Sequence, residues 1–188
     1  EGMQLARSGN TGGKTVTAET VIIPEVTDSL AFAKWLPSVK GKFVLISMPQ
    51  PTGRPDYNWD EFGTKESIEK MKADRNTLTD AWNKRIRNTG LSAVALANAL
   101  EKAGAAAIFS SYWSRAFGAN KIFGAQAKKI PTVDLSLEDY GLVYRLTESG
   151  QKPKLSLRAD SKELGVVPSF NVMAEIKGSE KPDEYVVL

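Results

Sequence analysis

The chain has 188 residues, of which 41% are apolar and 25% are charged, and its net charge at pH 7 is +3. This size and composition predict a folded protein with one hydrophobic core, which excludes a disordered chain and a mini-protein held together by disulfides. The sequence contains no histidine and no cysteine. Catalysis by Ser-His or Cys-His pairs and zinc binding through imidazole or thiolate are therefore excluded within this chain.

The first third of the sequence predicts a loop, a strand, a helix and a second strand. Four glycines predict a loop or linker over residues 1–14, and β-branched residues predict a strand over residues 14–23. Asp28 stands in an N-cap position before a short helix over residues 30–36. The nearly continuous apolar run at residues 43–48 is typical of a strand buried on both faces, so we expect it at the centre of a sheet.

The middle of the chain predicts a helical insertion over residues 51–88. Its first part, residues 50–63, contains two prolines and a glycine close together, which predicts an irregular loop. Residues 64–87 are highly charged, but their apolar residues fall on one side of a helical wheel, as in an amphipathic helix. Arg75 interrupts this narrow apolar stripe, and a bend in the helix at that point is one interpretation.

The remaining elements alternate between helices and strands. They are a helix over 91–103, a strand over 105–109, a loop over 110–129, a strand over 130–135, a helix over 136–150 and an edge strand over 154–158. Ser136 followed by Asp139 matches a capping box, which fixes the start of the last helix. Buried strands joined by helical crossovers favour a right-handed parallel arrangement.

The pattern of apolar and polar residues changes after residue 160. Residues 170–176 alternate between apolar and polar side chains, and residues 185–188 are apolar, which together predict a hairpin. We therefore expect residues 163–188 to be the truncated start of a second domain, and the chain to be part of a longer protein. No stretch approaches the roughly 20 apolar residues of a membrane span, so none is expected.

Two short segments match catalytic motifs in part. Residues 9–15 ("GNTGGKT") resemble a phosphate-binding loop, but Ser8 replaces its first glycine, and a strand is expected where the motif needs a helix. Ser67 and Lys70 match the Ser-x-x-Lys pattern of some acyl enzymes, but they stand in a charged helix without the other motifs of that class. We interpret both matches as coincidental, and we expect no catalytic residue in the chain.

The loop over residues 50–63 is the candidate site for recognition. Three of its acids, Asp56, Asp60 and Glu61, lack the spacing and the central glycine of a calcium-binding loop, so a solvated turn is the favoured interpretation. No metal site is expected in the chain.

Arg54, Tyr57 and Trp59 form the aromatic and arginine cluster of this loop, and such clusters often anchor binding partners. A single tryptophan that pins a long loop would explain the cluster equally well. Both interpretations stay open, and the three residues are candidate contacts with a substrate or partner.

Nucleic acid is not expected as a partner, although the isoelectric point is about 9.0. Basic and acidic residues alternate through the central helix, and the aromatic segment 112–123 holds only Arg115 and Lys121 as basic residues. A nucleic-acid site would combine a basic stripe with aromatic stacking platforms, and the sequence shows no such combination.

Three blocks of sequence, in the right order, resemble the protease-associated domain. They are "VKGKFVLISM" (39–48), "ALEKAGAAAIFSS" (99–111) and "IPTVDLSLEDYGLVYRLTESG" (130–150). Residues 167–188 look like the return into the catalytic domain of secreted zinc-dependent exopeptidases of the aminopeptidase type, which carry two co-catalytic metals. In that family the motif Gly-Ala-His-x-Asp, which supplies the first metal ligands, comes directly after this segment. No catalytic or metal-binding residue of the family maps onto this chain.

This resemblance implies an α/β fold, with a mixed, barrel-like sheet and about three helices over residues 15–162. It implies a non-catalytic accessory domain that covers or shapes the substrate cleft of a neighbouring catalytic domain in the same chain, with zinc in that neighbour alone. Its partners would be that domain and the peptide substrate, and its location secreted or periplasmic. The insertion 51–88 exceeds the family pattern, so no contact residue is carried onto it. The alternative is a stand-alone protein-interaction or sorting module.

Overall fold

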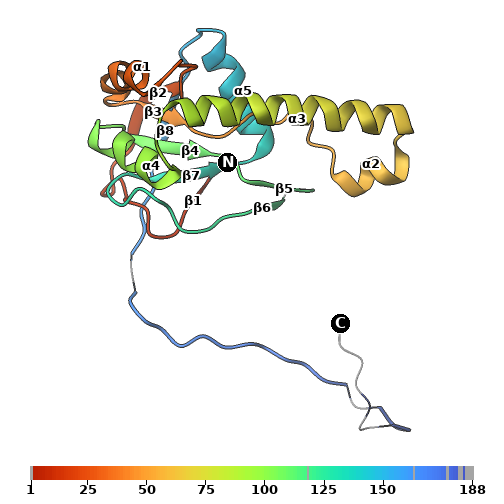
Figure 1. The fold of residues 1–188 in the computed structure, drawn as a ribbon. Helices are drawn as coiled ribbons and strands as arrows, with labels where there is room; N and C mark the ends of the chain where they lie inside the picture. The colour runs from red at the N-terminus through yellow and green to blue at the C-terminus, as the bar shows by residue number, and fades with distance from the viewer. Residues whose placement is uncertain (1, 118, 163, 177, 182–183, 185–188) are drawn as a thin grey trace.

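The computed structural model describes residues 2–117, 119–162, 164–176, 178–181 and 184. Most of them form a mixed α/β fold around a curled, half-barrel sheet of six strands in the order β1-β7-β4-β3-β2-β8 (Figure 1). The strands are β1 (Gly2–Gln4), β2 (Val16–Ile22), β3 (Phe43–Leu45), β4 (Ala107–Ser110), β7 (Thr132–Leu135) and β8 (Lys154–Leu157). The four inner strands run parallel, whereas β1 and β8 pair antiparallel at the two edges.

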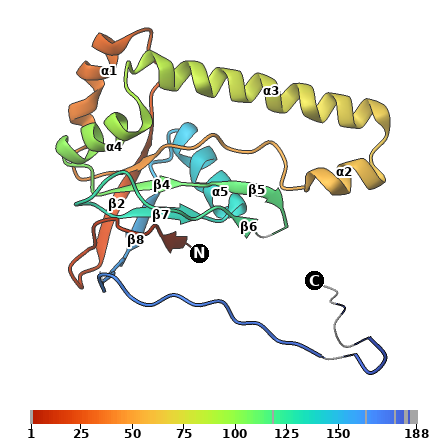
Figure 2. The ribbon, with the colours of Figure 1, turned by 60° about the horizontal axis from the view of Figure 1, so that its bottom comes forward.

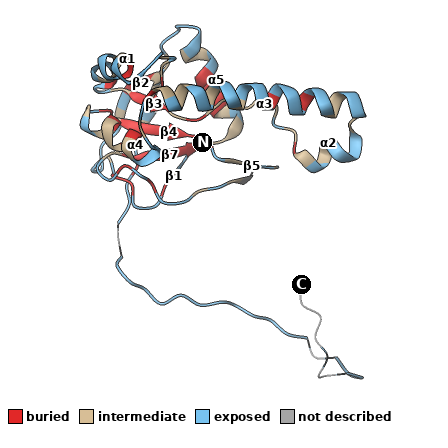
Figure 3. Ribbon diagram, viewed as in Figure 1, coloured by how far each residue is buried: buried red, intermediate tan, exposed pale blue. Residues whose placement is uncertain are grey.

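The two central strands confirm the prediction from their apolar runs. Every residue of β3 and β4 is buried, and Figure 3 shows both strands in red at the centre of the fold. Phe43 and Phe109 stack on one face of the sheet with their ring centroids 4.9 Å apart, while Val44 and Ile108 face the other side. Burial on both faces explains why neither strand shows polar alternation.

Helices cover both faces of the sheet. The α-helices are α1 (Ser29–Trp35), α2 (Asp56–Phe62), α3 (Lys65–Asn88), α4 (Ala93–Lys102) and α5 (Leu137–Glu148), and a 3-10 turn, η1 (Leu36–Val39), follows α1. One core cluster joins α1 and α4 to the sheet through Phe32 and Leu100, and the other joins α5 through Tyr140. The described residues thus form five α-helices, one more than the sequence pattern predicted and more than the three or so that the resemblance implied.

Helix α3 extends well beyond the sheet and carries α2 at its outer end (Figures 1 and 2). Its bounds, Lys65–Asn88, confirm the amphipathic helix predicted for residues 64–87, and the Thr64 side chain caps its first turn. The carboxyl-terminal half of α3 meets both core clusters, since Ile86 packs against one and Trp82 against the other. We call the projecting part, α2 with the outer half of α3, the arm.

Several segments differ from their sequence-based predictions. Residues 1–14 are not loop throughout, because Gly2–Gln4 pairs with β7. Within the predicted loop 110–129, β5 (Trp113–Ala116) and β6 (Ala119–Asn120) form a small hairpin, here called the β5–β6 hairpin. Strands β1, β5 and β6 are short, and they form because a neighbouring strand pairs with them. The periodicity of a sequence contains no information about such neighbours.

The predicted carboxyl-terminal hairpin is not formed in the described residues. Residues 164–176 form no helix or strand, and they run away from the sheet as an exposed segment (Figures 1 and 3). The apolar half of their alternation, including Phe170, Val172 and Ile176, is exposed. The second predicted strand, residues 185–188, lies outside the described residues. A strand needs a partner for its backbone groups, and the described chain gives none to this segment.

Tyr140 connects α5 to the segment after β3 through hydrogen bonds. Its buried hydroxyl donates to the Ser47 carbonyl at 2.7 Å and accepts from the Ser47 amide at 2.8 Å. Tyr140→Phe would leave both backbone groups buried without a partner, so we expect the free energy of unfolding to fall by about 2 kcal/mol. Chemical denaturation measures this loss. Tyr144→Phe, which removes only an acceptor for Arg85, serves as the control, and equal losses in the two variants would contradict the assignment.

Candidate functional site on the arm and hairpin

The segment predicted as an irregular loop contains a helix. Residues 50–55 are extended or irregular, but α2 begins directly after Pro55, whose φ of −60° and ψ of 152° suit an N-cap position. Asp56 follows in the first turn, where a negative charge stabilises a helix. The helix ends at Gly63, where an added Cβ would lie 2.6 Å from the Trp59 carbonyl oxygen, so the close turn into α3 requires glycine.

The structure brings two of the three predicted site residues together. The Arg54 guanidinium lies 4.8 Å from the centroid of the Trp59 ring, and its Nε donates to the Asn58 side chain. Trp59 is half-buried and, together with Met71, lines a cavity of about 350 Å³ between the arm helices and residues 51–52. Trp59 therefore pins the loop against α3, and Arg54 covers its face, so this pair supports the arm.

Tyr57 lies apart from that pair. Positions 57 and 59 differ by about 200° around a helix, so their side chains leave α2 in opposite directions. Tyr57 is 55% exposed and meets the ring of Phe117 edge-on, with the centroids 5.9 Å apart. Phe117, on the β5–β6 hairpin, is itself 65% exposed. The two aromatic rings thus join the arm to the hairpin and still present most of their area to solvent.

Asp56 links the same two elements through charge. Its carboxylate accepts a hydrogen bond from Arg75 of α3 at 2.7 Å and forms a 3.4 Å ion pair with Arg115 of the hairpin. Partial burial acts to raise the pKa of Asp56, but hydrogen bonds and positive charge from Arg75 and Arg115 outweigh it and hold the pKa below its ordinary value. The arginine that interrupts the apolar stripe of α3 is therefore the buried partner of this acid.

The hairpin is anchored to the sheet by a second aspartate. Asp134, at the end of β7, is buried and accepts hydrogen bonds from the Ser110 hydroxyl, the Tyr112 backbone amide and the Asn120 side chain. Burial raises the pKa of Asp134, and these hydrogen bonds offset the rise only in part. The Asn120 amide also donates to the Leu135 carbonyl at 2.8 Å, so both ends of the hairpin are held against the sheet.

We name the exposed patch formed by Tyr57, Arg115 and Phe117 the α2–hairpin surface. Figures 1 and 2 both place the hairpin beside α2, below the outer part of α3. Sequence reasoning identified Tyr57 but missed Arg115 and Phe117, which stand in a segment read as loop. Their local signal was weak, since only the number of aromatic residues in 112–123 set this segment apart.

The described residues offer no constellation for metal chemistry. No group of three or more acidic side chains within them lies close enough to hold a metal ion. Asp56 is engaged by its two arginines, and it does not join Asp60 and Glu61 in a common site. The exposed groups of the α2–hairpin surface are two aromatic rings and one guanidinium.

Comparison with known proteins connects part of this chain with peptidases. Over 60 residues, 32% of the chain, it is 37% identical to carboxypeptidase Q of Rattus norvegicus. The matched stretch of 60 residues is therefore similar in sequence to part of a peptidase. The match spans only 13% of the length of carboxypeptidase Q, and no family model matches the chain.

Two solved structures resemble the fold over most of the chain. An aminopeptidase from Aneurinibacillus sp. strain AM-1 gives a TM-score of 0.46 at 16% identity, with 85% of this chain and 27% of that protein covered. A peptidase M28 precursor from Shewanella amazonensis gives a TM-score of 0.43 at 14% identity, with 84% and 30% covered. The chain thus corresponds to less than a third of each of these proteins. The described residues contain no helix of the length and apolarity that a membrane crossing requires.

Proposed function

We propose that this chain is a protease-associated accessory domain of a zinc-dependent exopeptidase, and that its α2–hairpin surface contacts the catalytic domain beside the substrate cleft. The 37% identity with carboxypeptidase Q over 60 residues supports a peptidase as the parent protein. The three sequence blocks that resemble protease-associated domains support the accessory role. Peptide hydrolysis and zinc binding would belong to the neighbouring domain, and export from the cytoplasm is the location that goes with this family.

The observation that carries the assignment of the surface is an exposed aromatic pair on a fixed backbone. Tyr57 and Phe117 are each more than half exposed, although the elements beneath them are held by the ion pairs of Asp56. Aromatic side chains with few rotatable bonds lose little conformational entropy on binding, and they dominate the energetics of many protein interfaces. The two rings are therefore preorganised for contact with a protein surface or a bound peptide.

The position of the pair suits a cleft-shaping role. The arm carries α2 away from the sheet and the hairpin extends toward it from the ends of β4 and β7, so the α2–hairpin surface lies at one edge of the fold (Figure 2). A rigid projection beside a cleft would restrict the size of peptide that reaches the metals and would contact residues near the scissile bond. Arg115 adds a positive charge that can meet a carboxylate of a substrate or a neighbour.

Kinetics of the full-length protein test this proposal. We expect the double variant Tyr57→Ser/Phe117→Ser to lower kcat/KM for peptide substrates by about tenfold, the effect of losing roughly 1.4 kcal/mol of interaction. Because both side chains are more than half exposed, the variant should lose only their mutual edge-on contact, and the thermal stability of the protein should fall slightly. Leu30→Ser, which removes a side chain 74% exposed on α1, is the matched control and should leave kcat/KM unchanged.

Unchanged kinetics in the double variant would refute a role for this surface beside the cleft. If that variant also lost its binding to a separate protein, the alternative of a stand-alone interaction or sorting module would be favoured. Replacement of Arg54 and Trp59 together would affect both stability and kinetics, because these residues support the arm. The stability measurement therefore accompanies each assay.

A further inference from the structure

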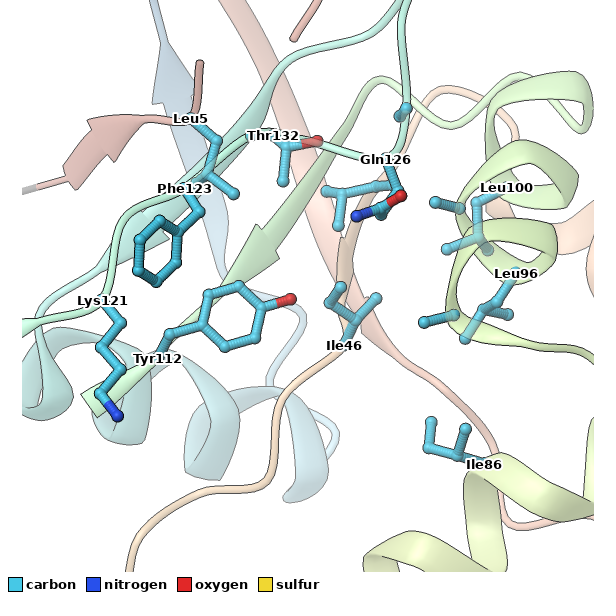
Figure 4. Close-up of a pocket in the computed structure, with 15 residues that line it drawn as sticks. Leu5, Ile46, Ile86, Leu96, Leu100, Tyr112, Lys121, Phe123, Gln126 and Thr132 are labelled. Carbon is cyan, nitrogen blue, oxygen red and sulfur yellow. The ribbon is translucent and has the colours of Figure 1, made fainter. Parts of the chain in front are cut away.

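A second, separate feature is a cavity of about 400 Å³ between α4, the end of α3 and residues 121–127 (Figure 4). Its walls are mainly aliphatic and come from the sheet and both helices. They include Ile46, Ile86, Leu96, Leu100 and Ile108. Cavities of several hundred Å³ with apolar walls and a few polar groups are the usual form of small-ligand sites. The cavity belongs to neither the arm nor the α2–hairpin surface.

The polar groups that reach this cavity are uncharged. In Figure 4 the Tyr112 hydroxyl and the Gln126 carboxamide point toward its centre, between Ile46 and the side chains of α4. Thr132 also lines the cavity, and its buried hydroxyl has no hydrogen-bond partner among the described residues. Lys121 stands at the rim beside Tyr112, with its ammonium group directed away from the cavity (Figure 4).

We propose that this cavity binds an uncharged ligand with an aliphatic or aromatic group next to an amide. The apolar walls take the hydrocarbon part, while Gln126 can donate to the amide oxygen and accept from its N–H. A charged group would lose its hydration among the aliphatic side chains, and Lys121 directs its ammonium group away from them (Figure 4), so the interior selects against charge. This site does not depend on the accessory role proposed above.

The size of the cavity fits one amino-acid residue with a large side chain. At about 400 Å³ it lies near the lower end of the range of roughly 300–1,000 Å³ that is usual for small-ligand sites, which suits a small ligand such as leucine or phenylalanine blocked as an amide at both ends. The same chemistry occurs in a residue within a peptide and in a small apolar amide, and these two sources can be separated by experiment.

Titration of the 188-residue chain with N-acetyl-leucinamide, followed by two-dimensional NMR, tests the proposal. We expect saturable binding with a Kd on the order of 1 mM, which is typical for a ligand of this size. The shifted resonances should belong to Tyr112, Gln126 and α4. N-acetyl-leucine, which carries a carboxylate, should bind at least fivefold more weakly. Absence of saturable binding, or equal binding of the acid and the amide, would overturn the proposal.

Two neighbouring positions on α4 provide matched variants. Ala93 lines the cavity at an exposed position, so Ala93→Phe should fill the mouth and abolish binding without disturbing the core. Val94 is half exposed and does not line the cavity, so Val94→Phe should bind normally. Loss of binding in both variants, or in neither, would contradict the location.

Replacement of Gln126 tests the polar part of the site. Gln126→Leu keeps the size of the side chain, so we expect about fivefold weaker binding of N-acetyl-leucinamide, whereas Gln151→Leu on the surface after α5 should change nothing. An unchanged affinity in Gln126→Leu would overturn the amide contact. The native chain is also titrated with N-acetyl-Ala-Leu-Ala-amide. If this peptide binds more tightly than N-acetyl-leucinamide, the ligand is a peptide. If the two compounds bind equally, the ligand is a small amide.

Discussion

Replacement of Asp56 by alanine should lower the free energy of unfolding by about 3 kcal/mol, because it leaves a buried guanidinium without its counter-ion. Arg75 is only 5% exposed, and Asp56 is the only residue among those described that pairs with its guanidinium. Its Nε and one terminal nitrogen already lack hydrogen-bond partners there. Chemical denaturation of the chain at neutral pH measures the loss.

Arg75→Met is the matched control for this experiment. An unbranched apolar side chain fits the stripe of α3, and it removes the buried charge together with the need for Asp56, so we expect a loss below about 1 kcal/mol. The native pKa of Asp56 is lowered, so its stabilising contribution is present at neutral pH and disappears as the pH falls through that pKa. Asp56→Ala should therefore approach the native stability in acid. A larger loss for Arg75→Met than for Asp56→Ala would contradict this account.

Replacement of Asp134 by alanine should have a similarly large effect, about 3 kcal/mol. The variant leaves the Ser110 hydroxyl, the Tyr112 amide and the Asn120 side chain without their acceptor at a buried position. The β5–β6 hairpin would lose its anchor to the sheet. Hydrogen exchange should accelerate in residues 112–120, while β3 and β4 stay protected. Exchange that rises equally throughout the sheet would contradict a local anchoring role.

The pH dependence of this second effect has the opposite sign. Burial raises the pKa of Asp134 in the folded protein, so its contribution to stability is fully present below the unfolded pKa and declines as the pH rises through the folded value. The stability difference between the native chain and Asp134→Ala should therefore be largest in acid. Ser110→Ala removes one of the donors that hold this pKa down, so its loss of stability should instead grow as the pH rises through the folded pKa of Asp134.

Local signals in the sequence were sufficient for most of the fold. The apolar runs that became β3 and β4 identified the centre of the sheet, because an apolar run of strand length without alternation is typical of a strand buried on both faces. The capping pattern at Ser136 located the start of α5, where its hydroxyl accepts from the Asp139 amide. The alternation at residues 154–158 correctly indicated an edge strand.

The candidate site depended on tertiary contacts that such signals do not contain. Three breakers in residues 51–55 concealed the helix directly after them, so the opposite directions of Tyr57 and Trp59 could not be foreseen. Arg75 in an apolar stripe was the available clue, since a buried arginine requires an acid nearby. Phe117 came to the surface beside Tyr57 only through the hairpin, whose strands are too short to be recognised from pattern.

The measurement that tests the central claim most directly is to determine the coding sequence of the source gene beyond the codon for Leu188. If this chain is the accessory domain of a zinc-dependent exopeptidase, the next residues should read Gly-Ala-His-x-Asp, which supplies the first metal ligands of that family. A stop codon or a long apolar span at that place would contradict the claim. The chain would then be an interaction module, with the α2–hairpin surface as the first place to look for its partner.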